Sequence, residues 1–130
     1  MPALHHIDSA AQLIITTWEG EARDVDFISA IKEYQENIQN KPQYINYNEV
    51  VDLSTATNIK LTTEGIRSLG QIAAATDPTG KNKKLAIIVS STLAYGLVRM
   101  YSAYRSFSKQ SNKTIQTFKN KQDAFEWVNK

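Results

Sequence analysis

The sequence predicts an α/β fold built around a mainly parallel sheet. Segments rich in β-branched and aromatic residues alternate with segments of helical spacing, in the order β-β-α-β-α-β-α-β-α. The segment Leu85–Val89 is apolar throughout, which is typical of a parallel strand that helices cover on both faces. We therefore expect five strands, an antiparallel hairpin at one edge, and four helices within one domain of residues 1–130.

The hairpin comes first. Residues 4–8 and 12–18 are predicted to be its strands, with a turn at residues 8–11, and Gly20 is expected to end the second strand. Asp24 is a plausible N-cap for the first helix, which should stop near Asn40, before Pro42. Its apolar residues recur at helical spacing: Phe27, Ile28, Ile31, Tyr34 and Ile38.

A buried strand is predicted over Tyr44–Leu53, followed by a polar loop over Ser54–Leu61. The second helix should cover Thr63–Thr76. Gly65 and Gly70 would each cost about 1 kcal/mol against alanine inside a helix, so they indicate close packing.

The third helix follows Leu85–Val89 and begins near Leu93. A helical wheel places its apolar residues on one arc, comprising Gly96, Leu97, Met100, Tyr101, Ala103, Tyr104 and Phe107. The lysines at 81, 83 and 84 are interpreted as part of the loop before the strand.

Thr114–Phe118 is the predicted final strand. Asn120, with Asp123 three residues later, resembles a capping arrangement for a closing helix. That helix should pack through Ala124, Trp127 and Val128.

The composition limits the function classes. The chain has no cysteine, which excludes disulfides, thiol catalysis and cysteine-based metal sites. The N-terminus does not resemble a signal peptide and no apolar run could span a bilayer, so we expect a cytoplasmic protein without membrane insertion. Residues 1–65 hold 4 Lys/Arg and 10 Asp/Glu, whereas residues 66–130 hold 11 and 3, an asymmetry compatible with an acidic partner or a second copy.

The segments 50–54, 62–69 and 85–89 together resemble the STAS domain, the fold of bacterial anti-sigma factor antagonists. Segments 85–101 and 118–128 look like those of small bacterial single-domain STAS-like proteins, and the Tyr-Gly-x-x-Arg-Met-Tyr run is the most specific motif. The resemblance covers nearly the whole chain. It implies a non-enzymatic regulatory or protein-interaction module.

In anti-sigma factor antagonists, an Asp-Ser-Ser/Thr-Gly stretch at the start of the second helix carries a phosphorylated serine. Thr63 stands at that position here, within Thr62-Thr63-Glu64-Gly65, so the resemblance implies that Thr63 is a phosphoacceptor. The aspartate of the pattern is replaced by Thr62 and the residue after the acceptor is Glu64, and either threonine could instead be a simple N-cap.

No catalytic or cofactor motif is present. His5 and His6 are the only histidines, and adjacent strand residues point to opposite faces, which argues against a shared metal. A Ser-His-Asp triad within the fold and the nucleotide-binding glycine motifs are not expected. We predict no enzyme activity, no cofactor, no metal site and no nucleic-acid binding.

Polar residues are predicted to meet at the carboxyl edge of the sheet, where open α/β sheets bind ligands. The predicted binding site comprises Asp52, Ser54, Ser91, Tyr95, Val98 and Arg99. Tyr95, Val98 and Arg99 fall outside the apolar arc, and Ser91 is near a helix N-terminus that suits an anion. Alternatively, Ser91 or Thr92 only caps the helix, Asp52 orders a loop and Arg99 pairs with a surface acid.

Two binding roles remain open at this point. The first is an interaction with an unknown protein partner or a second copy of the chain, for which an exposed apolar patch near Tyr95 would be evidence. The second is the binding of a small amphipathic ligand or lipid between sheet and helix. A deep apolar cavity would favour the second role.

Overall fold

The computed structural model describes residues 3–39, 41, 43–44, 47–75, 83–106 and 113–130. Within this part of the chain, five strands form one sheet in the order β1-β2-β3-β4-β5. β1 pairs with β2 in antiparallel orientation, and every other pairing is parallel. The predicted fold class is therefore confirmed. The elements in chain order are β1 (Ala3–Asp8), β2 (Leu13–Arg23), α1 (Asp24–Tyr34), η1 (Gln35–Gln39), β3 (Asn48–Lys60), α2 (Thr63–Ala75), β4 (Lys83–Ile88), α3 (Thr92–Ser106), β5 (Lys113–Phe118) and α4 (Lys121–Val128).

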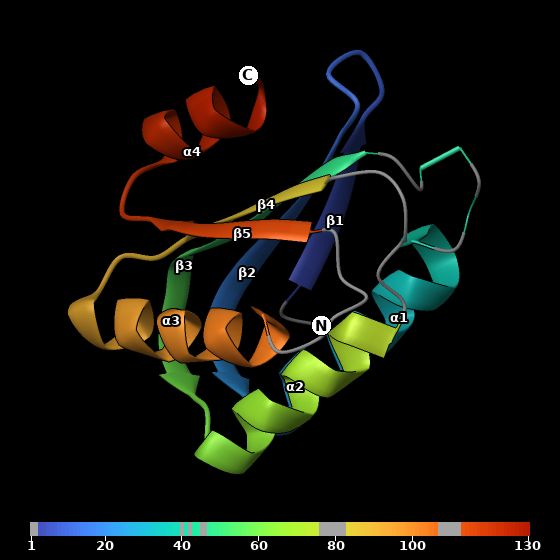
Figure 1. Ribbon diagram of the computed structural model, residues 1–130. Helices are drawn as coiled ribbons and strands as arrows, with labels where there is room; N and C mark the ends of the chain where they lie inside the picture. Colours follow the sequence, from blue (N-terminus) through green and yellow to red (C-terminus); the bar gives the residue numbers. More distant parts are fainter. Residues whose placement is uncertain (1–2, 40, 42, 45–46, 76–82, 107–112) are drawn as a thin grey trace.

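Helices cover both faces of the sheet. α1, α2 and α3 lie on one side of it and α4 lies alone on the other (Figure 1). Alternate residues of the central strands supply two separate cores, as the strand period of two requires. Val50 and Ala86 pack with Ala124 and Val128 of α4, whereas Leu53 and Leu85 pack with residues of α1, α2 and α3.

The strands β2 and β3 are longer than the sequence predicts. Gly20 does not end β2: it adopts φ 75° within the strand, and the register with β3 shifts on both sides of it. The predicted polar loop over Ser54–Leu61 is largely strand, because the extension of β2 supplies backbone partners for residues 55–60 of β3. The prediction failed because Ser and Thr side chains at a sheet margin give no apolar signal. At its other end, β3 begins at Asn48, and Tyr44 lies in a turn.

The first helix also differs from its prediction. α1 ends at Tyr34, and the chain continues as the π-helical turn η1. Asp24 is the first residue of α1 instead of its N-cap, and the backbone N–H of Arg23 donates to Asp26 Oδ2 at 3.0 Å. Asn40 and Pro42 lie outside the described residues.

The core face of α3 is rotated from the predicted arc. Ala94 and Val98 are buried in the core, and Tyr101 packs partly buried against it. Gly96 and Ala103 are exposed, and Met100 is 39% exposed, so the assignment of these three residues to the core face is wrong. The helix packs against α2 as well as against the sheet, which the wheel of a single helix cannot predict. The side chain of Tyr104 and residue Phe107 lie outside the described part.

The closing helix matches its prediction. The backbone N–H of Asp123 donates to Asn120 Oδ1 at 2.8 Å, and Asn120 Nδ2 donates to Asp123 Oδ2 at 2.9 Å. Ala124 and Val128 are buried, and Trp127 packs against the same core. None of the described helices is long and apolar enough to span a bilayer.

Candidate functional site

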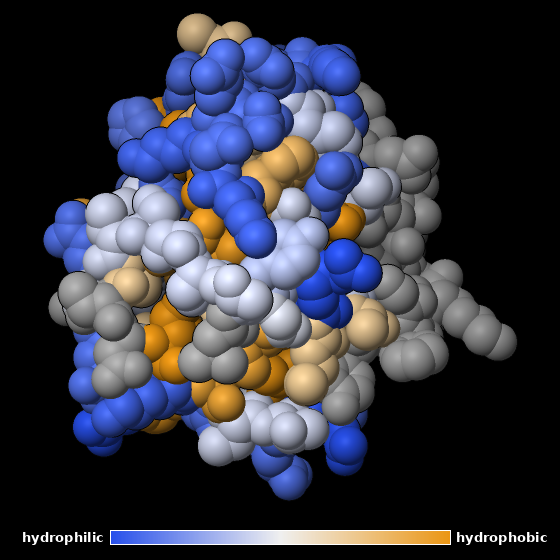
Figure 2. Space-filling model, turned by 90° about the vertical axis from the view of Figure 1, so that its left-hand side faces the viewer, coloured by the Kyte–Doolittle hydropathy of each residue, from blue (hydrophilic) through white to orange (hydrophobic). Residues whose placement is uncertain are grey.

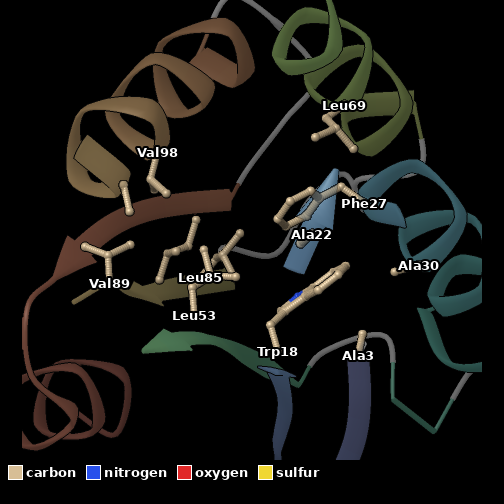
Figure 3. Packing of buried hydrophobic residues seen from close by; sticks show 12 residues of the cluster. Ala3, Trp18, Ala22, Phe27, Ala30, Leu53, Leu69, Leu85, Val89 and Val98 are labelled. Atoms are coloured by element: carbon tan, nitrogen blue, oxygen red, sulfur yellow. The ribbon is translucent and has the colours of Figure 1, made fainter. Parts of the chain in front are cut away.

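A cavity of about 140 Å³ lies between the sheet and helices α1, α2 and α3. Figure 3 shows part of its wall, with Leu53, Leu85 and Val98 on one side and Trp18 with Phe27 on the other. The rings of Trp18 and Phe27 pack 4.3 Å apart between their centroids, so that side of the wall is aromatic. Most of the lining is apolar: Trp18, Phe27, Ala30, Ile31, Val51, Leu53, Leu61, Ile66, Leu69, Leu85, Ile87, Leu97 and Val98.

Polar side chains occupy another part of the wall, formed by β1, β2, the amino end of β3, the end of α1 and Tyr101 of α3. His5 Nδ1 and Thr16 Oγ1 form a hydrogen bond of 2.7 Å between β1 and β2. The ring of Tyr34 lies 5.4 Å from that of His5, centroid to centroid. Burial lowers the pKa of His5, and the charge of Glu33 only partly opposes this, so the imidazole is neutral at pH 7. The polar lining residues are His5, Thr16, Tyr34, Gln35, Glu49 and Tyr101.

One of these polar lining residues, Glu49, belongs to a buried ion pair. Lys83 Nζ donates to Glu49 Oε1 at 3.0 Å, and the side chains are 1% and 8% exposed. Glu49 pairs in register with Leu85, so Lys83, two residues earlier on β4, is its diagonal neighbour on the same face. The interpretation of Lys83 and Lys84 as loop residues is wrong, because both belong to β4. Glu49 lines the cavity.

Helices α1 and α2, which cover part of the cavity, are joined by hydrogen bonds at their N-termini. The Asp24 carboxylate accepts hydrogen bonds from Thr62 N at 3.0 Å and Thr62 Oγ1 at 2.6 Å. A Cβ at Gly65 would overlap that carboxylate, so a side chain cannot be placed there without moving Asp24. The close packing that Gly65 indicates is thus confirmed, and it joins α1 to α2.

The predicted site at the carboxyl edge divides into two groups. Asp52 Oδ1 accepts hydrogen bonds from Ser54 N at 2.9 Å and Ser54 Oγ at 2.5 Å. Its Oδ2 lies 3.3 Å from Lys121 Nζ at the start of α4. Burial raises the pKa of Asp52, but the hydrogen bonds from Ser54 and the Lys121 ammonium outweigh it and hold that pKa below its ordinary value.

The second group lies on α3. Ser91 Oγ accepts from Ala94 N at 3.1 Å, so Ser91 is a cap, as in the simpler interpretation. The Tyr95 ring lies 6.0 Å from the Arg99 guanidinium and 5.2 Å from Lys119 Nζ. Arg99 and Lys119 are exposed, and Tyr95 is half-buried.

Val98 does not belong to that exposed group. It is 7% exposed, packs in the core and lines the cavity, so its assignment to a partner-facing surface is wrong. Asp52 follows Val50 at strand spacing and bonds to α4, whereas Tyr95 packs against the core of the opposite face. The structure therefore brings Asp52 to Ser54, and Tyr95 to Arg99, without joining the two pairs.

Comparison with known proteins identifies the fold. No protein-family model matches the chain, and no curated protein is significantly similar to it. A crystal structure of an uncharacterized protein of the DUF3478 family from Shewanella loihica, described as having a SpoIIAA-like fold, superposes with a TM-score of 0.56. The two sequences are 16% identical, and the match covers 97% of this chain and 93% of that one.

This chain has a SpoIIAA-like fold. The resemblance to STAS domains is thereby confirmed for the fold, and the sequence similarity is too low to carry a function across.

Within the SpoIIAA-like fold, the position of Thr63 is now defined. It is the first residue of α2 and is exposed, whereas Thr62 is the N-cap, because Gly65 N donates to Thr62 Oγ1 at 3.0 Å. Of the two threonines proposed as caps, Thr62 is the one that caps.

Sequence reasoning missed the residues of the polar wall. One available signal was Glu49, a charged residue directly before Val50 and Val51 in a buried strand, and another was Lys83, two residues before the apolar run of β4. Two opposite charges at the amino ends of adjacent parallel strands predict a buried pair. His5 and Thr16 meet only through the hairpin register. Among the residues that the structure describes, no cluster of three or more His, Asp or Glu could hold a metal ion.

Proposed function

We propose that this protein binds a small apolar or amphipathic molecule in the cavity between the sheet and helices α1–α3. The observation that carries the proposal is the cavity itself, of about 140 Å³ with a mostly apolar wall. An engineered apolar protein cavity of about 150 Å³ stays dry and binds benzene. The cavity therefore suits a single ring or a short chain, and a long lipid chain would require the helices to move.

The energy cost of an empty cavity supports this role. Side chains around an unfilled apolar space lack part of the packing contacts that a close-packed interior supplies. A ligand that fills the space restores the lost contacts and stabilises the folded state by mass action. A binding function gives a reason for the otherwise destabilising space.

Calorimetric titration with toluene tests the proposal. We expect saturable binding with one site per chain in the natural protein. Ala30→Leu should abolish it, because Ala30 lines the cavity and the larger side chain fills the space. Ala103→Leu is the matched control, since Ala103 is an exposed helical alanine on α3 and should leave binding unchanged. Absence of saturable binding in the natural protein would refute the proposal.

The second candidate function is a regulatory or protein-interaction role, which the fold resemblance implies. The observation in its favour is the surface of α3, where Arg99 and Lys119 flank Tyr95 and Met100 is 39% exposed. Figure 2 shows apolar side chains in recesses between polar residues on the side of the molecule that faces left in Figure 1. A cationic and aromatic surface of this kind suits an acidic partner, including the acid-rich half of a second copy.

Sedimentation velocity over a wide concentration range tests the homodimer. Reversible dimerisation that Arg99→Glu abolishes would support it. A monomer at every concentration would exclude it. Both candidate roles are binding roles, and we infer a non-enzymatic cytoplasmic protein that requires no cofactor.

Thr63 remains a candidate phosphoacceptor on the strength of its position. Its exposure at the start of α2 makes it accessible to a kinase. Intact-mass measurement of the protein from its native cells would reveal a phosphorylated fraction, and Thr63→Ala should remove it. An unmodified mass under all growth conditions would argue against this role.

A further inference from the structure

One ring nitrogen of His5 is bonded within the protein, and the other is not. His5 Nδ1 forms the 2.7 Å hydrogen bond with Thr16 Oγ1 between β1 and β2. Within the described part of the chain, His5 Nε2 makes no hydrogen bond and no ion pair. Because His5 lines the cavity, Nε2 is the ring nitrogen that remains for a ligand.

The register of the hairpin places His5 beside the aromatic part of the wall. His5 pairs with Thr16, and Ala3 pairs with Trp18, so these four side chains share one face of the sheet. Trp18 is the diagonal neighbour of His5, which is within reach of a large aromatic side chain. Phe27 packs on Trp18. A small ring that packs against these aromatic residues can therefore carry a substituent toward His5.

The hydrogen bond to Thr16 determines what Nε2 can do. If the Thr16 hydroxyl donates to Nδ1, the ring proton is on Nε2, which then donates to a ligand. If Nδ1 donates to Thr16, Nε2 is an acceptor. A hydroxyl group both donates and accepts, so it is a partner for Nε2 in either tautomer.

The charges of the polar wall are already compensated. The carboxylate of Glu49 is balanced by the buried ammonium of Lys83. Burial lowers the pKa of His5, so its imidazole is neutral at pH 7. A charged ligand would lose its hydration in this mostly apolar space, and no uncompensated opposite charge is present among the described lining residues. The wall therefore favours a neutral ligand.

We infer that the ligand is a neutral molecule of about one ring that carries a hydroxyl group, and that His5 Nε2 is the hydrogen-bonding partner of that hydroxyl. This inference rests on the proposed ligand-binding function and adds the chemical class of the ligand.

Toluene and phenol test the inference by calorimetric titration at pH 7.5, because they have nearly equal size and differ in a methyl against a hydroxyl group. We expect phenol to bind the natural protein at least as tightly as toluene. In His5→Leu, the affinity for phenol should fall about tenfold relative to that for toluene, since the hydroxyl loses its partner. His6→Leu is the matched control: His6 is the exposed neighbour on β1, and the ratio of the two affinities should not change.

Nitrogen NMR of the natural protein decides the inference if His5→Leu does not fold. The chain has only two histidines, so their ring nitrogens can be assigned with His6→Leu. Phenol should shift the Nε2 resonance of His5, whereas toluene should shift it much less, and neither should move the resonances of His6.

Three outcomes would count against the inference. An unchanged ratio of phenol to toluene affinity in His5→Leu would overturn it, and so would equal Nε2 shifts with phenol and toluene. Binding of toluene without binding of phenol would also overturn it and leave the proposed function standing. Failure of both probes to bind would overturn the inference and the proposed function together.

Discussion

The two faces of this sheet are packed in different ways. On the α4 side, the small residues Ala86 and Ala124 are both fully buried and let the helix approach the strands closely. On the other side, three helices cover the sheet and leave a cavity of about 140 Å³ beneath them. Ala86 and Ala124 keep no exposed surface on the α4 side, whereas the other side keeps a space. The difference supports the proposal that the α1–α3 face binds the ligand.

Buried acids show the same contrast. On the α4 face, Asp52 is paired with Lys121, whose side chain is 63% exposed. On the cavity face, Glu49 is paired with Lys83, which is only 1% exposed. A solvated lysine can pair with a buried carboxylate without losing its own hydration, whereas a buried lysine must itself be removed from water. Burial of the Glu49–Lys83 pair therefore costs more desolvation free energy than burial of Asp52 beside the exposed Lys121.

The largest expected effect comes from breaking the buried pair. Lys83→Met should reduce the free energy of unfolding by about 3–5 kcal/mol, because it leaves the Glu49 carboxylate buried without its lysine. Lys121→Met is the matched change on the opposite face and should cost at most about 1 kcal/mol, since Lys121 is exposed. Urea unfolding measures both. Equal costs for the two variants would contradict the contrast between the faces.

The next effect compares one substitution at two buried helical alanines. Ala124→Leu should destabilise the protein by about 1–3 kcal/mol, because Ala124 is fully buried in the core on the α4 side and the larger side chain would overpack it. Ala30→Leu should be neutral or stabilising by about 0.5–2 kcal/mol, since it fills part of the cavity. Alanine and leucine have similar helix propensities, so packing dominates the difference. The account fails if Ala30→Leu is as costly as Ala124→Leu in the same unfolding assay.

A smaller effect concerns acid stability on the α4 face. The pKa of Asp52 lies below its ordinary value of 3.8 in the folded state, so the unfolded state takes up this proton first as the pH falls. The stability that the carboxylate contributes is complete above about pH 3.8 and is lost as the pH drops through the folded pKa. Asp52→Asn should therefore have a lower free energy of unfolding than the natural protein at pH 6, and this difference should disappear in strong acid. A difference that stays constant with pH would show that the charge of Asp52 is not its cause.

The smallest effect is the pH dependence from His5 on the cavity face. Its folded pKa is lower than the ordinary 6.5, so its contribution is complete above about pH 6.5 and decreases as the pH falls below that value. His5→Gln should flatten the stability profile in that range, whereas His6→Gln, which changes the exposed neighbour on β1, should keep the slope. Thermal unfolding at a series of pH values measures the two profiles. The same slope in His5→Gln and the natural protein would refute this assignment.

The sequence predicted the order of the elements and the fold class, because apolar periodicity and turn residues are local signals. Local signals also predicted the helix cap formed by Asn120 and Asp123 and the close packing at Gly65. The strand extension past Gly20 was not visible, since it depends on polar residues of another strand that supply the backbone partners.

The site was harder to predict than the fold. A wheel drawn for α3 alone could not place Val98, because α2 shares that helix's packing surface. Asp52 and Tyr95 were expected at one edge of the sheet, but strand alternation directs Asp52 toward α4. The cavity arises from helices that stand over large side chains from several strands, and no single segment encodes it.

The chain's two tryptophans provide the most direct test of the central claim, because Trp18 lines the cavity and Trp127 packs on the opposite face. Trp127→Phe leaves Trp18 as the only tryptophan, and Trp18→Phe leaves Trp127. Toluene titration should change the fluorescence of the Trp18 protein saturably and leave that of the Trp127 protein unchanged. No saturable change at Trp18, or an equal change at Trp127, would contradict the conclusion that the α1–α3 face binds a small ligand.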